Sequence, residues 1–373
     1  MWRQTWAEID LGRLRHNVAV VQAQVGKRVK ILASVKANAY GHGVVEVSKA
    51  LLSVGVHGLG VATIEEAVEL RDAGIVAPIL CYGALAPGVH EVVAERQIAV
   101  SVMNTEEIAR LASAARVTGR GVDIHVKVDT GMGRLGVRGE MAFLQVMRAA
   151  TSTDGVRLRG VYTHFSSADD PLDAQVDETR TQAQELSSLV ARAREVGIDV
   201  PLVHAANSAA IFRDPQYHFD WVRPGIALYG YHPFSSGHQT VELLPVLSLY
   251  TRIVRVADMP PGATVSYGRT FVCEKPEQIA TLPIGYADGL PRALSNAGRL
   301  DLGGHNVQIA GRVCMDQTMI VTTGLHAKLG DVVRIYGGQE HAHASLADAA
   351  RQLGTIPYEL LCAISSRVPR IYV

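Results

Sequence analysis

"KILASVKANAYGHGVVEVSKALLSVGVHGLGVAT", residues 30–63, contains one complete strand–helix–strand unit. Residues 30–36 form a short apolar run that is typical of a buried strand, and residues 44–55 carry apolar side chains at the three- and four-residue spacing of a helix. A second apolar run follows at 57–63. Because two strands joined by a helix are normally parallel, this stretch predicts a parallel α/β architecture.

The same unit recurs along the first two thirds of the chain. Eight strand candidates occur before about residue 230, and seven are followed by a helical pattern before the next strand. The remaining six candidates are residues 77–83, 98–103, 122–130, 156–165, 201–208 and 221–230. Eight such units predict a (β/α)8 TIM-type barrel. The alternative is an open doubly wound sheet, which normally has fewer units and a glycine-rich fingerprint after its first strand; no such fingerprint is found here.

After about Phe234 the pattern changes to alternating, β-branched segments separated by Gly, Pro and Asn. This pattern predicts a mainly β domain, which ends in two short helical patterns and a closing strand. We therefore expect a barrel domain over residues 1–234 and a mainly β domain over 235–373. The first ~10 residues are compatible with joining the β domain.

Composition restricts the class of protein. Thirty-six basic residues balance 36 acidic ones without blocks of like charge, which argues against a nucleic-acid or membrane-surface partner. The four cysteines form no C-x-x-C pair, so a disulfide scaffold or zinc ribbon is disfavoured and a reducing cytoplasm is expected. The sequence also shows neither a secretory signal nor an apolar stretch long enough to span a bilayer.

Barrel enzymes keep their active sites at the carboxyl ends of the strands, so the residues at those ends are the candidates for function. Ile226 belongs to the loop after the eighth strand. The polar residues and glycine at the strand ends are Lys36, Tyr40, Lys127, Asp129, Arg134, His164, His204, Asn207, Ser208, Arg223 and Gly225.

Lys36 follows the first strand, where it has two interpretations. It either extends its ammonium out of the core into water, or serves as a reactive amine whose lowered pKa lets it condense with a carbonyl. The loops after strands seven and eight, the usual phosphate site of this fold, contain Asn207, Ser208 and Gly225. Each motif alone is compatible with a simple helix cap or turn. Together with Lys36 they favour pyridoxal phosphate, whose phosphate Tyr40 could also reach.

The sequence resembles alanine racemase, the fold-type III pyridoxal phosphate enzyme of bacterial cell-wall synthesis, nearly from end to end. The shared motifs, in chain order, are "SVKANAYGHG", "HVKVDTGMGRLGV", "THFSSAD", "ANSAA", "RPGIALYG", "VSYGRT", "LPIGYADG" and "GRVCMDQTM". The resemblance implies an isomerase that interconverts L-alanine and D-alanine and supplies D-alanine for peptidoglycan. It also implies a homodimer in which each active site combines one barrel with the β domain of the partner.

The resemblance assigns two catalytic residues. Lys36 carries the cofactor as a Schiff base and serves the D-alanine face, while Tyr267 from the partner subunit serves the L-alanine face. The resemblance further implies that Arg223 faces the pyridine nitrogen and that the phosphate is held by Tyr40, Asn207, Ser208, Gly225, Ile226 and Tyr358. It implies that Arg134 and the backbone of Met315 bind the substrate carboxylate, and that Tyr286, Tyr358 and Met315 restrict the pocket to a small side chain. His164 would link Tyr267 to Arg223, and His204 would support that link.

Two positions leave questions open. Lys127 lies in an apolar strand, where a lysine tends to lose its proton, and the family often carries a carbamate there that orients Arg134. A simple contact of Lys127 with Asp129 or with solvent is the alternative. The family often has aspartate where this chain has Val321, which concerns packing of the β domain rather than the catalytic residues.

Three rival functions remain at this stage. Fourteen histidines and a strand-end lysine are compatible with a metal-dependent barrel hydrolase, although the histidines are scattered and lack the H-x-H spacing of such sites. A pyridoxal phosphate decarboxylase on the same fold and a non-catalytic cofactor-binding protein are the others. We assign no functional role to His42, His57 or His125.

Overall fold

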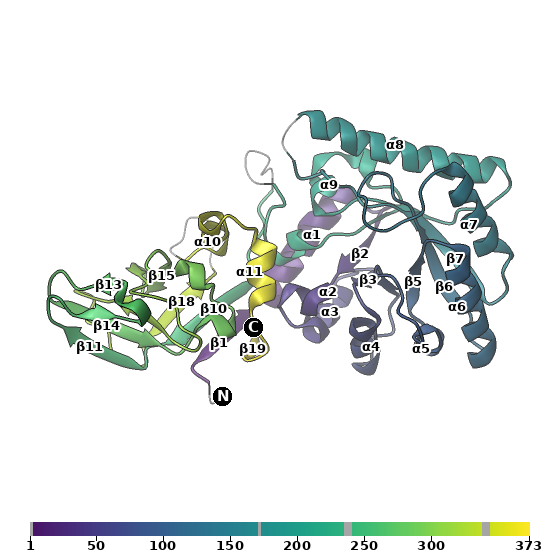
Figure 1. Cartoon of the computed structure of the whole chain (residues 1–373). Helices are drawn as coiled ribbons and strands as arrows, with labels where there is room; N and C mark the ends of the chain where they lie inside the picture. The colour runs from purple at the N-terminus through teal and green to yellow at the C-terminus, as the bar shows by residue number, and fades with distance from the viewer. Residues whose placement is uncertain (1–2, 171–172, 235–240, 338–343) are drawn as a thin grey trace.

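The computed structural model describes residues 3–170, 173–234, 241–337 and 344–373. Its larger part is a closed barrel of eight strands that follow one another in chain order (Figure 1). The parallel pairing confirms the predicted (β/α)8 barrel, and the open doubly wound sheet is wrong. The strands are β2 (Lys30–Ser34), β3 (Gly58–Val61), β4 (Ile79–Cys81), β5 (Ala99–Val102), β6 (Val122–Lys127), β7 (Val156–Tyr162), β8 (Val203–His204) and β9 (Trp221–Val222).

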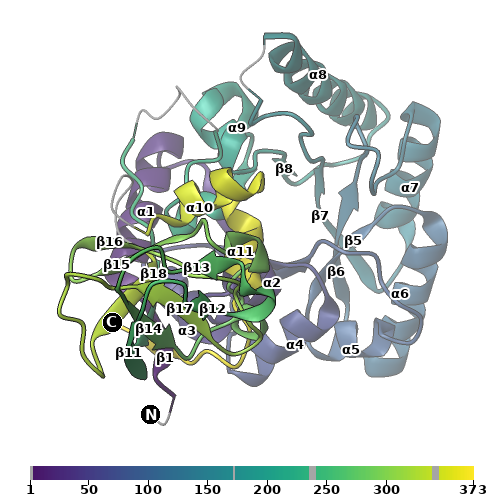
Figure 2. The ribbon, with the colours of Figure 1, turned by 60° about the vertical axis from the view of Figure 1, so that its left-hand side comes forward.

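Helices surround this barrel on the outside, as Figure 2 shows for α4 to α8. They begin at residues that favour helix starts: Thr63 and Glu66 form a capping box at α4, and Asn104 caps α6. The helices of this part are α1 (Leu11–Val25), α2 (Lys36–Tyr40), α3 (Val44–Ser53), α4 (Ile64–Asp72), α5 (His90–Glu95), α6 (Thr105–Thr118), α7 (Glu140–Ser152), α8 (Asp173–Glu195) and α9 (Ser208–Arg213).

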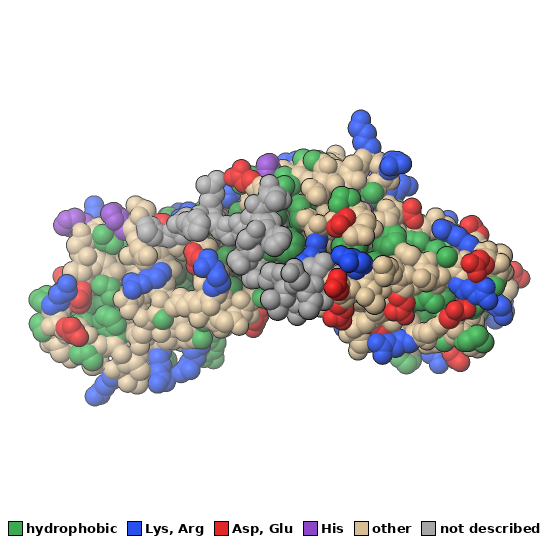
Figure 3. Space-filling model, turned by 90° about the horizontal axis from the view of Figure 1, so that it is seen from above, with side chains coloured by type: hydrophobic (Ala, Val, Ile, Leu, Met, Phe, Trp, Pro, Cys, Tyr) green, Lys and Arg blue, Asp and Glu red, His purple; other side chains and the backbone are tan. Residues whose placement is uncertain are grey.

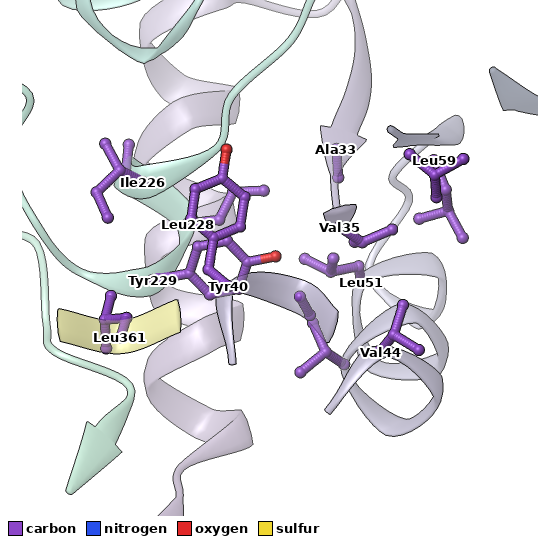
Figure 4. Packing of buried hydrophobic residues seen from close by; sticks show 14 of the residues in the cluster. Ala33, Val35, Tyr40, Val44, Leu51, Leu59, Ile226, Leu228, Tyr229 and Leu361 are labelled. Carbon is purple, nitrogen blue, oxygen red and sulfur yellow. The ribbon is translucent and has the colours of Figure 1, made fainter. Parts of the chain in front are cut away.

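The main core lies inside the barrel and between the barrel and its helices. Strand β2 is buried on both faces after Lys30, as expected for a parallel strand covered by helices. Figure 4 shows Ala33, Val35 and Leu59 of this core close to Leu51 of α3. Full burial of each large aliphatic side chain contributes roughly 1.5–3 kcal/mol, so this core anchors the strand ends that carry the functional residues.

The second part is mainly β, as predicted. Its largest sheet has the strand order β16-β15-β18-β10-β1-β19, and β1 (Thr5–Ile9) pairs antiparallel with β10 and parallel with β19. The expected domain boundary at 234/235 adjoins residues outside the described part of the chain. The other strands are β10 (Leu247–Arg252), β11 (Arg255–Met259), β12 (Thr264–Val265), β13 (Phe271–Val272), β14 (Glu277–Leu282), β15 (Arg299–Leu302), β16 (His305–Gln308), β17 (Thr318–Val321), β18 (Val332–Tyr336) and β19 (Arg370–Tyr372).

Val321 ends β17 opposite Ile279 of β14. Its side chain packs on a small apolar cluster with Val265, Cys273, Ile279 and Ala310. Valine therefore suits this position because its neighbours are apolar, whereas an aspartate there would need a polar partner.

Two short helices lie between β18 and β19 in the chain, α10 (Leu346–Leu353) and α11 (Pro357–Ala363). Helix α11 lies against α2, beside the first barrel strand (Figure 1). Basic and acidic side chains are interspersed over the face that Figure 3 shows. Among the described residues, no helix combines the length and the apolar character that crossing a membrane requires.

Candidate active site

A cavity of about 260 Å³ lies at the carboxyl ends of the barrel strands. Its volume is near the lower end of the range for small-molecule sites. The structure brings together in it most of the residues predicted from the sequence: Lys36, Tyr40, Lys127, Arg134, His164, Asn207, Ser208, Arg223, Gly225, Ile226 and Tyr358. A larger hollow of about 780 Å³ adjoins it through Asp169, Pro233 and Tyr358, but the residues described around it include neither Lys36 nor Arg223.

The segment α2 after β2 begins with Lys36 and is a left-handed turn instead of a regular right-handed helix. Residues 37–40 all have a φ of 53°. Residues other than glycine avoid this conformation, which costs about 1–2 kcal/mol for each residue. The turn ends at Gly41, whose φ is 81° and where an added Cβ would lie 2.2 Å from the carbonyl oxygen of Leu361. This backbone directs Lys36 and Tyr40 to the same cavity.

The surroundings of Lys36 favour a neutral amine. Burial lowers the pKa of Lys36, and the positive charges of Arg134 and Arg223 lower it further, against an opposing effect of Glu66. The side chain lines the cavity instead of standing free on the surface. An unprotonated amine in a cavity is a nucleophile that can condense with an aldehyde.

The loops after β8 and β9 form a cradle opposite Lys36. Asn207 caps α9 by accepting a hydrogen bond from the Ala210 amide at 3.0 Å. The hydroxyl of Ser208 accepts one from the Gly225 amide at 2.9 Å. At Gly225 an added Cβ would lie 2.4 Å from the Tyr40 hydroxyl oxygen, so only glycine leaves room there.

Tyr40 and Tyr358 line the cavity, and Tyr229 packs against Tyr40. The rings of Tyr40 and Tyr229 lie 4.7 Å apart, side by side in Figure 4, and the rings of Tyr40 and Tyr358 lie 5.9 Å apart. Tyr358 comes from α11, so the end of the chain contributes to a cavity that the barrel begins. Hydroxyl donors around a site with room for a ligand oxygen suit the phosphate of pyridoxal phosphate.

Arg223 follows β9, lines the cavity and is buried. Its guanidinium donates to the carbonyl oxygens of Thr163 at 2.8 Å and Ala205 at 2.9 Å, and to Nδ1 of His204 at 2.9 Å. A longer contact of 3.4 Å joins it to Nδ1 of His164. A guanidinium only donates, so both ring nitrogens accept. Burial and then the charge of Arg223 hold the pKa of both histidines well below the usual value, which keeps them neutral.

His125 extends this network, although the sequence analysis gave it no role. Its Nδ1 lies 3.1 Å from Nε2 of His204. Because Nδ1 of His204 accepts from Arg223, Nε2 of His204 carries the proton and donates a hydrogen bond to Nδ1 of His125. The sequence contains a usable signal: His125 is two residues before Lys127, so the alternation of strand β6 places both side chains on the same face.

Lys127 is buried, with Nζ 5.5 Å from the ring centroid of Tyr162. Burial and the charges of Arg134, Arg223 and Lys36 lower the pKa of Lys127 to about 8. The carboxylate of Asp129 accepts instead from the amides of Gly131 and Gly133, at 3.2 and 2.9 Å, and pairs with Arg138 at 3.2 Å. Arg134 is exposed at the cavity wall, where an anion can approach it.

Tyr82 lines the cavity and was not among the predicted residues. It follows β4, so the strand-end rule alone points to it. Its hydroxyl lies 3.4 Å from the hydroxyl of Ser34. Gly60 makes room for it, because an added Cβ there would lie 1.9 Å from the Tyr82 hydroxyl oxygen.

Tyr267, Tyr286 and Met315 lie on the β part of the chain and do not line this cavity. Their exposed fractions are 72%, 43% and 52%. Backbone hydrogen bonds hold the last two together: the Tyr286 amide donates to the Cys314 carbonyl and the Ala287 amide to the Met315 carbonyl, each at 3.0 Å. We call Tyr267, Tyr286 and Met315 the exposed group of the β part. Large apolar side chains in a group at the surface are typical of a protein interface.

In the described ranges, no three His, Cys, Asp or Glu side chains are gathered closely enough to hold a metal ion.

The chain is similar over nearly its whole length to known proteins. The N-terminal domain model of alanine racemase matches residues 9–233, and the C-terminal domain model matches residues 246–372. The chain is 41% identical to alanine racemase 2 of Caldanaerobacter subterraneus subsp. tengcongensis over 372 residues, covering 100% of this chain and 95% of that protein. It is also 41% identical to alanine racemase of Methanococcus maripaludis, covering 99% and 98%.

Solved structures show the same likeness. The alanine racemase of Clostridium difficile 630 superposes with a TM-score of 0.93 at 34% identity, covering 100% of this chain and 96% of that one. The alanine racemase of Bacillus anthracis with bound L-Ala-P superposes with a TM-score of 0.92 at 36% identity, with the same coverage. The chain therefore belongs to the alanine racemase family of isomerases.

Proposed function

We propose that this racemase interconverts L-alanine and D-alanine with pyridoxal 5′-phosphate, using Lys36 and Tyr267 of the partner subunit as two bases on opposite faces of the substrate. One observation carries the proposal: an amine with a lowered pKa, a buried arginine and a hydroxyl-lined cradle share one cavity. The domain division at 234/235 belongs to the same proposal, with the barrel binding the cofactor and the β domain supplying Tyr267.

The residues of the cavity fit the cofactor. Lys36 would hold it covalently through its amine, and Arg223 would donate to the pyridine nitrogen. Tyr40, Asn207, Ser208, Gly225, Ile226 and Tyr358 would hold the phosphate. When bound, the cofactor withdraws electrons from the carbon next to the substrate amine and so acidifies its hydrogen.

Arg223 keeps its proton at any ordinary pH, so it can hold a nitrogen by donation without protonating it. The neutral His204 and the two carbonyl oxygens fix the guanidinium in place from the other side. His164 accepts through Nδ1, which leaves its Nε2–H free to donate. We propose that this donor meets the phenol oxygen of Tyr267 of the partner subunit and helps it to carry negative charge.

Proton movement then needs only two side chains. Lys36 would be released as a free amine once the substrate amine has replaced it on the cofactor. It would then remove the Cα proton of D-alanine from one face, and Tyr267 of the partner subunit would return a proton to the other. Conversion of L-alanine runs through the same groups in reverse. One proton leaves and one arrives, so no oxidant or reductant is consumed.

The substrate is held by Arg134, whose exposed guanidinium can pair with its carboxylate, with help from the backbone of Met315. We propose that Met315 and Tyr286 reach this cavity from the partner subunit, as Tyr267 does. The bulk of Tyr286 and Tyr358 would then limit the side chain to a methyl group, although each additional methylene changes binding by only about 1–3 kcal/mol.

The shared site has a direct test. Lys36→Ala and Tyr267→Phe homodimers are mixed, dissociated and allowed to reassociate. If sites combine two subunits, half of the dimers are mixed and each has one intact site, so about a quarter of wild-type activity returns. If each site comes from one chain, mixing restores nothing. The exposure of Tyr267, Tyr286 and Met315, the exposed group of the β part, supports the first outcome.

Lys127 is proposed to carry a carbamate. Its pKa of about 8 leaves part of the amine neutral near pH 7, and that amine can add carbon dioxide with loss of one proton. The resulting anion would lie near the positive charge of Arg134 and orient it. Asp129 is engaged by two glycine amides and Arg138, which disfavours the simpler Lys127–Asp129 pairing.

We further propose that the enzyme acts in the cytoplasm and supplies D-alanine for peptidoglycan, without nucleic-acid or membrane partners. Four cysteines that form no disulfide support a reducing compartment. The deciding experiment for the main proposal is reduction of the purified, cofactor-loaded protein with borohydride, followed by peptide mapping and an assay of D-alanine formed from L-alanine. Label on another lysine, or a labelled protein that forms no D-alanine, would refute the proposal.

A further inference from the structure

His42 is buried next to the left-handed turn and has no part in the proposed reaction. The turn is energetically unusual, because four successive residues without a glycine, 37–40, have a φ of 53°. Isolated residues visit this region, but runs do not persist without support from their surroundings. Asn38 is a residue type that visits this region, but Ala37, Ala39 and Tyr40 are not, so contacts must support the turn.

The imidazole of His42 provides part of that support. Its Nδ1 lies 3.0 Å from the carbonyl oxygen of Ala39 and 2.9 Å from that of Tyr40. Backbone carbonyls only accept, so Nδ1 carries the proton and donates to both. The side chain is 0% exposed, and burial lowers its pKa to about 4, so the ring is neutral near pH 7.

The other nitrogen of this ring shows that His42 is more than a packing residue. Nε2 is buried with no hydrogen-bond partner among the described residues. An unpaired buried acceptor is unfavourable, and an apolar side chain of similar size would avoid it. The reason for a histidine at this position is therefore the pair of hydrogen bonds that its Nδ1–H donates to the carbonyls of the turn.

The ring also couples the turn to the cavity wall. It lies 4.6 Å from the ring of Tyr229, which in turn lies 4.7 Å from the ring of Tyr40 (Figure 4 shows the two tyrosines). The Tyr229 hydroxyl donates to the carbonyl of Ser34 at 2.9 Å, at the end of β2. Both ends of the segment that carries Lys36 are thus tied to one buried stack.

We propose that His42 is a positioning residue for Lys36 and Tyr40, and that its Nδ1–H maintains the left-handed turn that aims both side chains into the cavity. The inference rests on the proposed function, because it gives the turn a purpose only if Lys36 holds the cofactor. His42 is not among the residues that line the cavity.

The test uses the cofactor-loaded enzyme and three substitutions. His42→Leu removes the donor and should lower kcat roughly ten- to hundredfold through misplacement of Lys36. The KM for alanine should change little, because Arg134 is not part of the turn. The variant should also lose bound cofactor faster on dialysis, measured by visible absorbance. His42→Asn, whose amide can donate near the position of Nδ1, should retain most activity, whereas His42→Gln, which reaches the Nε2 position, should behave like the leucine variant.

A second substitution that relieves the left-handed strain of the turn tests whether the loss in His42→Leu comes from the turn. Adding Ala37→Gly to His42→Leu removes the side-chain penalty in the turn and should recover a large part of kcat and cofactor retention. Adding Ala19→Gly, in the exposed face of α1, should recover nothing. If the leucine variant does not fold, the asparagine and glutamine pair decides.

Equal activity of the asparagine and glutamine variants, a fully active leucine variant, or an absence of rescue by Ala37→Gly would each overturn the role of His42. The proposed function fails separately: it falls if Lys36→Ala remains active and coloured, whatever the His42 variants do.

Discussion

Ala37→Gly should stabilise this protein, although glycine substitutions normally destabilise proteins. Ala37 is exposed, and its φ of 53° and ψ of 51° lie in the left-handed region. The substitution does not remove the hydrogen bond from the Ala37 amide to the Glu66 carboxylate at 2.6 Å, because the donor is the backbone N–H. The methyl group contributes almost no burial, so its removal affects mainly the backbone.

The magnitude follows from two opposing effects. Removing the Cβ relieves about 1–2 kcal/mol of left-handed penalty, while glycine gives the unfolded chain extra entropy worth roughly 0.5–1 kcal/mol. The expected net stabilisation is about 0.5–1 kcal/mol. The matched control is Ala19→Gly, also exposed but within the right-handed helix α1, which should destabilise by about 1 kcal/mol.

The assay is urea unfolding of both variants and the parent, at one protein concentration and with cofactor bound. The midpoint should rise for Ala37→Gly and fall for Ala19→Gly, with an unchanged slope. A fall of the same size for both variants would refute the reasoning, because it would mean that the backbone at Ala37 carries no left-handed penalty.

Three further predictions concern the site and its titration. Tyr267→Phe should slow racemisation by roughly 10²–10⁴-fold, with exchange of the Cα hydrogen in deuterated water lost mainly from L-alanine; near-normal turnover would remove Tyr267 from the mechanism. Carbon dioxide uptake by Lys127 should increase as the pH rises through about 8, since the neutral amine reacts; carbon-13 NMR with labelled bicarbonate checks this, and Lys127→Met, which should lack the signal, is the control. Burial lowers the pKa of His125 to about 4, so between about pH 6.5 and pH 4 the unfolded chain binds more protons than the folded one. The free energy of unfolding should therefore fall on acidification, and the urea midpoint of His125→Gln should fall less steeply than that of the parent. An identical fall would contradict a buried neutral imidazole.

Much of the site could be predicted from the sequence because its residues follow strand ends. In a parallel barrel every carboxyl end faces the same mouth, so Lys36, Arg134, Asn207 and Arg223 converge as a consequence of topology alone. The same rule points to Tyr82. The cradle proposed for the phosphate was expected from helix-capping chemistry, and Asn207 does cap α9.

Other features depended on contacts between distant parts of the chain. Apart from Asn38, the residue types at 37–40 do not predict a left-handed turn. Contacts with His42 and Glu66 support it, as does Arg370 near the other end of the chain, whose Nε donates to the Gly41 carbonyl at 3.0 Å. Similarly, Tyr267, Tyr286 and Met315 lie outside the cavity of their own chain, and no local pattern reveals that.

The sequence by itself determined the architecture, since the alternation of apolar runs and helical spacing is a local property that the barrel and the β domain simply express. It also determined the chemical character of the residues at the barrel mouth. Only the tertiary structure decided the pKa of Lys36 and Lys127 and the direction of Lys36. Burial and the charges of Arg134 and Arg223, which follow β6 and β9, lower the pKa of both lysines, and residues beyond the turn hold the turn that directs Lys36. Burial and charge depend on what surrounds a residue in space, and that is not contained in any short stretch of the chain.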